Sequence, residues 1–322
     1  MRASKTERHM LSLRILSLGT YLPRRVVDNA AMLASFPELG ERDLERIGVR
    51  SRHEAAEDED VPTMAVRASR TALERANVAA EALDFLLLVN WSERRYVPDI
   101  APRVQEMLGA RRAFAFDLGC ACAGFVYALS VAQGYLQNPR FKRGLIVASD
   151  YSRRRVRPGS RASLLFGDAA AAAVVGSNVA GGFRLVDYEL GTDGSRSELM
   201  DVDAENYLVT HVRQRELNDL AVASLVRAGK NLLARQQLSF ADVDYIVPHS
   251  GTAGIQSMLS EALSVPREKI LTNLPLVGNV TAASIPTALE HFLQVGTLRP
   301  RQRVLVLAVG VGWQFVARLN EL

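Results

Sequence analysis

The chain has 322 residues, 48% of them hydrophobic and 23% charged, and its formal net charge is +4 at pH 7. This length allows one large domain or two closely packed ones, and the composition is that of an ordinary soluble globular protein. No apolar run reaches the roughly 18 residues of a membrane span, and no apolar segment of signal-peptide length follows the opening residues, so we expect a cytoplasmic protein. The mild positive charge favours an acidic partner or an anionic substrate over a nucleic-acid surface.

The chain is predicted to divide into a tail and two halves. Residues 1–12 form the N-terminal tail, residues 13–176 the first half and residues 177–322 the second half. The alanine-rich segment 166–176, FGDAAAAAVVG, predicts a tightly packed strand that closes the first half.

Three pairs of predicted elements recur at one offset. Apolar strands begin at Leu83 and Val243, an offset of 243 − 83 = 160. The other two pairs, at the same offset, are small-residue stretches that open helices, from Cys122 and Ala282, and short strands, from Gly144 and Val304. Three matches at one offset indicate a duplicated α/β unit, with mostly parallel strands covered by helices and a site between the halves.

Both cysteines of the chain lie in one stretch, DLGCACAGFVYALS, at residues 117–130. Two cysteines with one residue between them are a poor disulfide framework, so we expect a reduced thiol. A strand ending near Leu118 would deliver Cys122 to the first residues of a buried helix, where free N–H groups and the helix dipole lower the pKa of a thiol. We therefore predict Cys122 as a nucleophile and Cys120 as packing support, although a small apolar cysteine filling a crowded helix start is the alternative.

The repeat also indicates partners for this thiol. His249 follows the second half's matching strand, and Asn279 precedes the second half's matching helix. A lone histidine is usually structural, and an asparagine after glycine usually forms a turn. Because both residues stand at the ends of elements equivalent to those around Cys122, we predict that the three share one site.

Eight stretches over nearly the whole chain carry a family resemblance: YLPRRVVDN, IGVRSRH, ACAGFVYALSVA, LFGDAAAAAV, GTDGSRSELM, VPHSGT, GNVTAASIPTALE and AVGVGW. They resemble the β-ketoacyl-acyl-carrier-protein synthase III group of the thiolase superfamily. The resemblance implies a thiolase-like α/β fold, a five-layer αβαβα duplication with two mixed sheets. It also implies a homodimer, or else a heterodimer, joined edge to edge through the strand and helix of residues 114–129.

The resemblance places a Cys-His-Asn triad at Cys122, His249 and Asn279, and it implies an acyltransferase of this type. The Cys122 thiolate would attack an acyl thioester of coenzyme A or acyl carrier protein, with an oxyanion hole at the backbone of Cys122 and the loop Gly310, Val311 and Gly312. A malonyl-type or β-ketoacyl thioester would then supply the carbanion, giving a β-keto product of the fatty-acid or polyketide type. No metal or redox cofactor is implied, and neither a nucleic acid nor a membrane is an expected partner.

Two other functions stay open. The same acyl-enzyme could hand its acyl group to a hydroxyl, an amine or another non-malonyl acceptor. Alternatively, the chain could be a noncatalytic partner subunit of a heterodimeric condensing enzyme, which retention of all three triad residues disfavours.

The mouth of the substrate tunnel is expected at Phe166, Arg161, Arg46 and Arg42. The chain departs from its relatives here, because Arg42 stands near the position of a tryptophan that reads coenzyme A. VPHSGT also lacks the amides that normally follow the histidine, and the carrier-docking positions hold Asp219, Gly254 and Glu261 in place of basic residues. These departures indicate specialised metabolism more than the initiation of fatty-acid synthesis.

The densest basic cluster is Arg153, Arg154, Arg155 and Arg157. It is the candidate for holding an anionic carrier or a coenzyme phosphate in place of the missing docking charges. A solvated loop is the alternative.

Overall fold

The computed structural model describes residues 13–93, 95, 97–177, 181–249 and 251–322. The predicted tail over residues 1–12 and Ser250 of the VPHSGT motif lie outside the described residues.

Nine strands form one mixed sheet in the order β11-β12-β13-β8-β1-β7-β6-β4-β5. The strands are β1 (Arg14–Tyr21), β4 (Phe85–Val89), β5 (Phe114–Leu118), β6 (Arg143–Asp150), β7 (Ala169–Gly176), β8 (Phe183–Thr192), β11 (Tyr245–Pro248), β12 (Arg303–Gly310) and β13 (Gln314–Glu321). Only the pairs β4–β5, β4–β6 and β11–β12 are parallel. The expectation of mostly parallel strands is therefore wrong, because β1, β7, β8 and β13 join the sheet antiparallel to their neighbours.

The two halves meet within this sheet through a short contact between β1 and β8. Among the described residues, Arg14 pairs with Arg184 and Ile15 with Phe183, and the Leu185 N–H donates to the Leu13 carbonyl at 3.0 Å; β8 also pairs with β13. Gly182, with φ +67°, makes the approach possible, because a Cβ at this position would overlap the carbonyl oxygen of Ile15. The expectation of two separate sheets is corrected on this point, since hydrogen bonds join the two sets of strands into one sheet.

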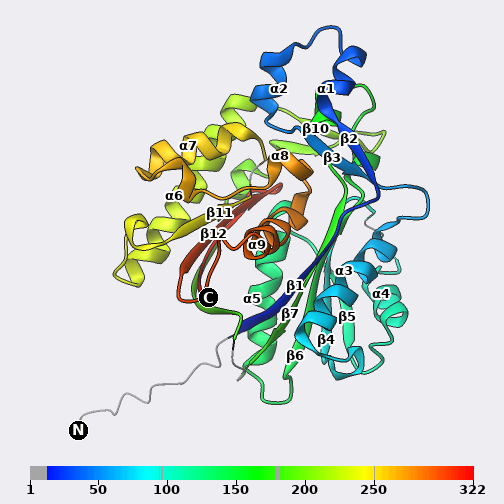
Figure 1. Ribbon diagram of the computed structural model, residues 1–322, viewed down its shortest axis with the longest axis vertical. Helices are drawn as coiled ribbons and strands as arrows, with labels where there is room; N and C mark the ends of the chain where they lie inside the picture. The colour runs from blue at the N-terminus through cyan, green and yellow to red at the C-terminus, as the bar shows by residue number, and fades with distance from the viewer. Residues whose placement is uncertain (1–12, 94, 96, 178–180, 250) are drawn as a thin grey trace.

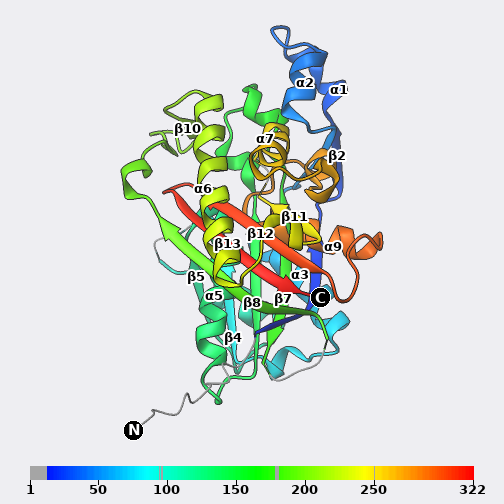
Figure 2. The same cartoon turned by 90° about the vertical axis from the view of Figure 1, so that its left-hand side faces the viewer.

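Helices pack on both faces of the strands (Figures 1 and 2). The helices α3 (Val61–Ala76) and α4 (Ala101–Leu108) cover the outer face of the first half, and α6 (Gln214–Arg235) and α7 (Ala253–Leu263) cover the outer face of the second. The helices α5 (Gly124–Leu136) and α9 (Ser284–Gln294) lie between the two sets of strands. In β4 every residue is apolar and buried, and alternate side chains reach the central and the outer core.

The remaining short elements gather at the end of the molecule where α2 is labelled in Figure 1. They are α1 (Asn29–Met32), α2 (Glu41–Ile47), α8 (Leu274–Val277), the pair β2 (Arg25–Asp28) with β3 (Ser51–Glu54), and the pair β9 (Met200–Val202) with β10 (Leu208–Thr210). Among the helices that the structure describes, none is long and apolar enough to cross a membrane.

The predicted repeat at an offset of 160 is present in the backbone. It relates β4 to β11, the 3₁₀ turn η3 (Ala121–Ala123) to η9 (Thr281–Ala283), α5 to α9, and β6 to β12. Even single residues correspond, because Asp84 accepts a hydrogen bond from the backbone of Arg143 at 2.9 Å and Asp244 accepts one from Arg303 at 2.7 Å. The predicted strand within residues 166–176 is β7, whose residues are all buried.

Candidate active site

Cys122 lies in the 3₁₀ turn η3, between the end of β5 and the start of α5, as predicted. The turn is tight, since Cys120 and Ala121 both have positive φ angles, of 82° and 42°. Such left-handed conformations are costly for residues other than glycine and cluster at functional sites. The backbone therefore directs Cys122, and not Cys120, to the first residues of the helix.

The electrostatics of the Cys122 thiol differ from the prediction. The residue keeps some exposed surface, but burial of the thiol among protein atoms, together with the nearby Asp150 carboxylate, raises its pKa to about 12. The hydrogen bond from the backbone opposes these effects without reversing them. The expected lowering of the thiol pKa by the helix start is therefore wrong for the free protein, because desolvation outweighs it.

Asp150, the last residue of β6, is a buried group that sequence reasoning missed. Its Oδ1 accepts hydrogen bonds from the backbone of Trp91 at 2.9 Å and of Ser92 at 3.1 Å, and the Thr281 hydroxyl donates to its Oδ2. Burial raises the pKa of Asp150 to about 6, although these hydrogen bonds favour the charged form. An aspartate that ends an apolar strand is the only sequence signal that could have found it.

His249 follows β11 and is 6% exposed. Its backbone N–H donates to the carbonyl of Leu307 on β12 at 2.7 Å, which continues the parallel pairing of the two strands. Burial lowers the pKa of the imidazole to about 4, so the ring is neutral at pH 7. Its Nδ1 atom has no hydrogen-bond partner among the described residues.

Asn279 lies just before the turn η9, and its side-chain amide has a defined orientation. The backbone N–H of Thr281 donates to Asn279 Oδ1 at 2.9 Å, which leaves the Nδ2 group as a donor. The Asn279 backbone is held by the loop before β7, since its N–H donates to Leu165 at 2.8 Å and its carbonyl accepts from Gly167 at 3.1 Å.

The glycine-rich loop at the end of β12 packs against the Cys122 turn. A Cβ on Gly310 would lie 2.5 Å from the carbonyl oxygen of Cys120 and 3.1 Å from the backbone nitrogen of Ala123, so only glycine fits here. Val311 and Gly312 continue the chain into the turn that leads to β13. The structure therefore places the predicted oxyanion loop beside the predicted nucleophile.

These segments converge in the central layer. The turn η3 contacts both η9 and the end of β12, so Cys122, the turn after Asn279 and Gly310 are neighbours. A Cβ on Gly251 would lie 4.0 Å from Asn279 Nδ2, which shows that the chain just after His249 passes the asparagine amide. All three predicted triad residues thus lie at the ends of central-layer elements.

The predicted mouth residues lie on two adjoining segments. Phe166 forms a bridge with Asn279, while Arg161 pairs with Asp43 of α2 at 3.2 Å. Arg42 and Arg46 are exposed on α2. Buried side chains of α2, of the loop over residues 161–166 and of α8 form one apolar cluster, against which the first residue of α7 packs. The predicted mouth is therefore a continuous region, with α2 on its outer side.

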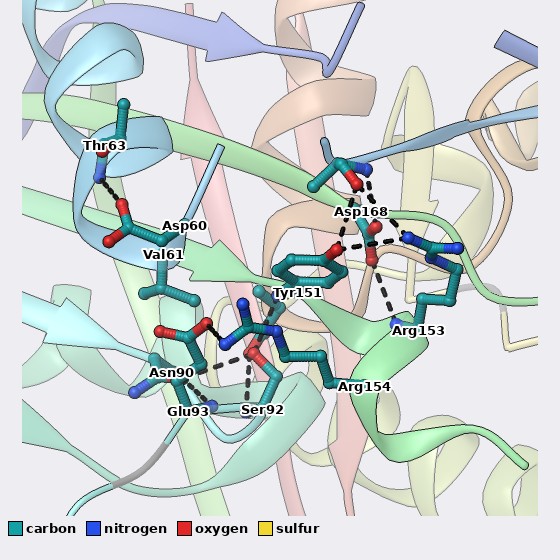
Figure 3. A network of polar contacts seen from close by, with 12 residues as sticks. Asp60, Val61, Thr63, Asn90, Ser92, Glu93, Tyr151, Arg153, Arg154 and Asp168 are labelled. Carbon is teal, nitrogen blue, oxygen red and sulfur yellow. Dashed lines mark hydrogen bonds and ion pairs between the residues drawn. The ribbon is translucent and has the colours of Figure 1, made fainter. Parts of the chain in front are cut away.

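The arginine cluster is engaged in contacts within the chain, and Figure 3 shows Arg153 and Arg154 among their neighbours. Arg153 pairs with Glu54 at 3.6 Å, and Arg154 pairs with Glu93 and lies 4.3 Å from the centre of the Tyr151 ring. The other members are held similarly, Arg155 by the carbonyl of Ser92 at 2.6 Å and Arg157 by Asp203 at 2.7 Å and Glu205 at 2.8 Å. Much of the cluster's positive charge is therefore balanced locally.

The three residues at the predicted carrier-docking positions lie on two helices of the second half. Asp219 of α6 and Glu261 of α7 are exposed acids, and Gly254 lies in the first turn of α7. Thr252, before α7, accepts a hydrogen bond from the Asn218 side chain at 3.3 Å.

Comparisons with known proteins agree with this geometry. A sequence model described as "3-Oxoacyl-[acyl-carrier-protein (ACP)] synthase III" matches residues 116–194, and one described as its C-terminal part matches residues 233–321. The β-ketoacyl-[acyl-carrier-protein] synthase III of Pectobacterium atrosepticum is 34% identical over 315 residues, covering 95% of this chain and 98% of the relative.

Solved structures give the same result. The 3-oxoacyl-[acyl-carrier-protein] synthase III of Aquifex aeolicus superimposes with a TM-score of 0.90 at 30% identity, covering 96% of this chain and all of the other. The priming β-ketosynthase of the R1128 polyketide pathway superimposes with a TM-score of 0.89 at 29% identity, covering all of this chain and 98% of the other. The thiolase-like α/β fold expected from the sequence is confirmed.

Proposed function

The chain belongs to the β-ketoacyl-[acyl-carrier-protein] synthase III family of acyltransferases, and from this premise we propose that it carries an acyl group on Cys122 and condenses it with a malonyl-type or β-ketoacyl thioester. The observation that carries the proposal is the orientation of Asn279. Its Oδ1 accepts from Thr281, which leaves Nδ2 as the donor that could stabilise an enolate oxygen.

The first step transfers the acyl group to sulfur. Cys122 Sγ attacks the thioester carbonyl, and the backbone N–H groups of Cys122 and Val311 stabilise the tetrahedral oxyanion. The bond from the carbonyl carbon to the donor sulfur then breaks, and the proton of the Cys122 thiol leaves with the donor thiol. Because burial raises the pKa of Cys122, the free protein holds a neutral thiol, which must lose its proton once the substrate is bound.

The second step forms the carbon–carbon bond. Loss of carbon dioxide from a malonyl thioester leaves an enolate, to which neutral His249 and the Asn279 amide donate hydrogen bonds. The enolate carbon attacks the acyl carbonyl and the bond to Cys122 Sγ breaks. The products are a β-ketoacyl thioester and the Cys122 thiolate, which takes a proton from solvent to restore the free enzyme. A neutral imidazole suits its role because it donates a hydrogen bond to the enolate without giving up its proton.

The donor is proposed to be a thioester of coenzyme A or of an acyl carrier protein that enters past α2. Arg42 and Arg46 lie on that helix, and the structure describes no ion pair for either, so they can meet a phosphate. Residues 13–176 would supply the nucleophile and residues 177–322 the two donors, and a twofold partner would cover the edge of β5.

Acyl transfer to a hydroxyl or an amine by the same acyl-enzyme is the second candidate. The exposed acids Asp219 and Glu261 favour it, because they would repel the acidic carrier that normally delivers a malonyl group. A noncatalytic partner role is the least favoured, since it would require none of the geometry around Asn279.

Intact-protein mass spectrometry after incubation with a panel of acyl thioesters tests the proposal. We expect an acyl mass on the wild type and on Cys120→Ala, and none on Cys122→Ala, which is the matched variant two residues away. Malonyl thioester added afterwards should remove that mass and yield a β-keto product. Equal loading of Cys122→Ala would disprove the nucleophile, whereas discharge only by alcohols or amines would favour the second candidate.

A further inference from the structure

Arg318 is a buried cation for which the described residues supply no ion pair. It lies on β13 and is 1% exposed. Its Nε donates to Asn320 Oδ1 at 2.8 Å, but neither Nη atom has a hydrogen-bond partner among the described residues. Buried guanidinium groups are normally paired, so two free Nη groups need an explanation.

The side chain of Arg318 faces the central layer. Side chains alternate along a strand, and Phe315, Ala317 and Leu319 pack into the outer core with α6. Val316, which shares the face of Arg318, packs into the central core with α5 and α9. Arg318 therefore belongs to the same layer as the turn that carries Cys122.

The helix α5, which follows the Cys122 turn, lies along β13, the strand that carries Arg318. The Tyr127 hydroxyl of α5 donates to the carbonyls of Gly191 on β8 at 2.7 Å and of Phe315 on β13 at 3.2 Å. Figure 2 shows α5 beside the paired strands β8 and β13. An acyl chain on Cys122 that enters this layer would run between α5 and these two strands.

The distance along β13 suits such a chain. Gln314 pairs with Gly310, whose backbone packs on the Cys122 turn. Arg318 is four residues further, about 13 Å along a strand. Between them on the same face, Leu190 of β8 pairs with Val316 and keeps 41% of its surface exposed. Leu190, an apolar side chain that is not fully covered, thus lies on this face of the sheet between the level of Gln314 and that of Arg318.

The carboxylates on the neighbouring elements are engaged elsewhere. On β8, Asp187 and Glu189 both bind Arg235 of α6, on the outer face. On α9, Glu290 binds Arg75 of α3. Burial lowers the pKa of Arg318 to about 9, which still leaves it charged at pH 7. Within the described part of the chain, this charge has no anion to pair with, which is an unfavourable arrangement until one arrives.

We propose that Arg318 binds a carboxylate at the far end of the acyl chain, so that the donor is the monothioester of a dicarboxylic acid. The two free Nη groups form the planar fork that matches both oxygens of a carboxylate. This inference rests on the proposed acyl-enzyme at Cys122 and names its substrate class. It adds no covalent step, because one carboxyl forms the thioester and the other remains an ion.

Competitive loading tests the inference. The wild type is incubated with an equimolar mixture of suberoyl-coenzyme A and octanoyl-coenzyme A, which differ only in the terminal carboxylate, and both masses on Cys122 are measured. We expect at least a tenfold excess of the suberoyl mass, and loss of this preference in Arg318→Met. Arg227→Met is the matched control, because Arg227 lies over Phe315 on the outer face of the same strand, 4.7 Å from the ring centre, and should not affect the preference.

The outcomes separate the two levels of the proposal. If neither donor loads Cys122, the acyl-enzyme itself is wrong. If octanoyl loads as well as suberoyl in the wild type, the acyl-enzyme stands and the carboxylate site is wrong, whether or not Arg318→Met folds. Preference for an 8-hydroxyoctanoyl over a suberoyl chain would equally overturn the site for an anion. The same competition between glutaryl-coenzyme A and pentanoyl-coenzyme A, and between adipoyl-coenzyme A and hexanoyl-coenzyme A, tests shorter chains.

Discussion

The backbone N–H of Thr281 donates to Asn279 Oδ1 at 2.9 Å, while the hydroxyl of the same threonine donates to the buried Asp150 carboxylate. One residue thus orients the amide that we assign to the enolate and ties it to β6. The φ angle is 55° at Thr281 and 42° at its repeat partner Ala121, so both residues adopt a left-handed conformation and a strained turn occurs on both sides of the site.

Asn279→Ala should leave acylation of Cys122 largely intact and reduce condensation by about a hundredfold or more, the effect of losing one oxyanion donor. Loading is measured by intact mass and condensation by product formation from a malonyl thioester. Asn273→Ala is the control, since Asn273 is also buried but binds the Thr287 hydroxyl away from the site. Unchanged condensation in Asn279→Ala would remove the enolate role and favour the alternative acceptors.

Asp150→Asn should make the free Cys122 thiol more reactive. The charge of Asp150 is one of the causes that raise the thiol pKa, so its removal should lower that pKa. Each unit by which the pKa falls increases the thiolate fraction about tenfold. The measurement is the iodoacetamide alkylation rate at pH 8.5 in a Cys120→Ala background. Asp168→Asn is the matched control, because burial also raises the pKa of Asp168 to about 6, while Asp168 is not among the causes that shift the pKa of Cys122. Equal rates in both variants would refute the coupling.

Protonation of His249 in acid should lower the free energy of unfolding. Its folded pKa, about 4, lies below the ordinary value of 6.5, so the stability it contributes is present above pH 6.5 and is lost as the pH falls towards 4. The full effect is about 3 kcal/mol of unfolding free energy. Asp150 and Asp168 act in the opposite direction, since their pKa values are raised to about 6.

The test is therefore a difference between two proteins. Urea unfolding at pH 7 and pH 4.5 should show a smaller acid-induced loss of stability in His249→Gln than in the wild type, because only the histidine is removed. A loss of the same size in both proteins would show that His249 is not held neutral by burial.

The sequence predicted the repeat and the three triad positions because these depend on local patterns. Apolar periodicity marks β4 and β11, and small residues mark the helix starts after Cys122 and Asn279. The properties that were missed depend on residues distant in sequence. Desolvation of the Cys122 thiol, the contact of Asp150 with Thr281 and the approach of Gly182 to Ile15 arise only when the chain is folded.

The arginine cluster illustrates the same limit. A run of basic residues indicates a phosphate site or a solvated loop, and local sequence cannot distinguish them. The acids that bind the cluster, Glu54, Glu93, Asp203 and Glu205, lie between 46 and 99 residues away. The better candidate for a phosphate site is therefore α2, where Arg42 and Arg46 are exposed.

Arg42→Gln with Arg46→Gln should raise the KM for coenzyme A thioesters severalfold at low salt, with little change in kcat, because surface charges guide encounter more than chemistry. The effect should fall with added salt and should be absent for an N-acetylcysteamine thioester, which has no phosphates. Arg154→Gln with Arg157→Gln is the control, since both arginines are paired within the chain. A larger effect from this control pair would return the phosphate site to the arginine cluster.

The outer edge of β5 indicates how two copies of the chain would form a dimer. β5 is the last strand of the sheet, and among the described strands it pairs with β4 alone, so no strand covers its outer edge, although the Asp117 N–H donates to Asp99 Oδ2 at 3.1 Å. Phe114 is 36% exposed there, and its ring packs with those of Phe116, Tyr135 and Phe141. An apolar, unprotected edge of this kind is an aggregation hazard in a monomer, so we expect a twofold partner to cover it.

Light scattering should therefore give the mass of a dimer at micromolar concentration. Phe116→Arg should shift the protein to monomer or aggregate, because the substitution places a charge at the covered edge. Val202→Arg, on β9, replaces an exposed apolar residue in a separate two-stranded sheet and should leave the dimer intact. A stable wild-type monomer would contradict the prediction, and so would a dimer that Phe116→Arg leaves unchanged, since its interface would then lie on another face.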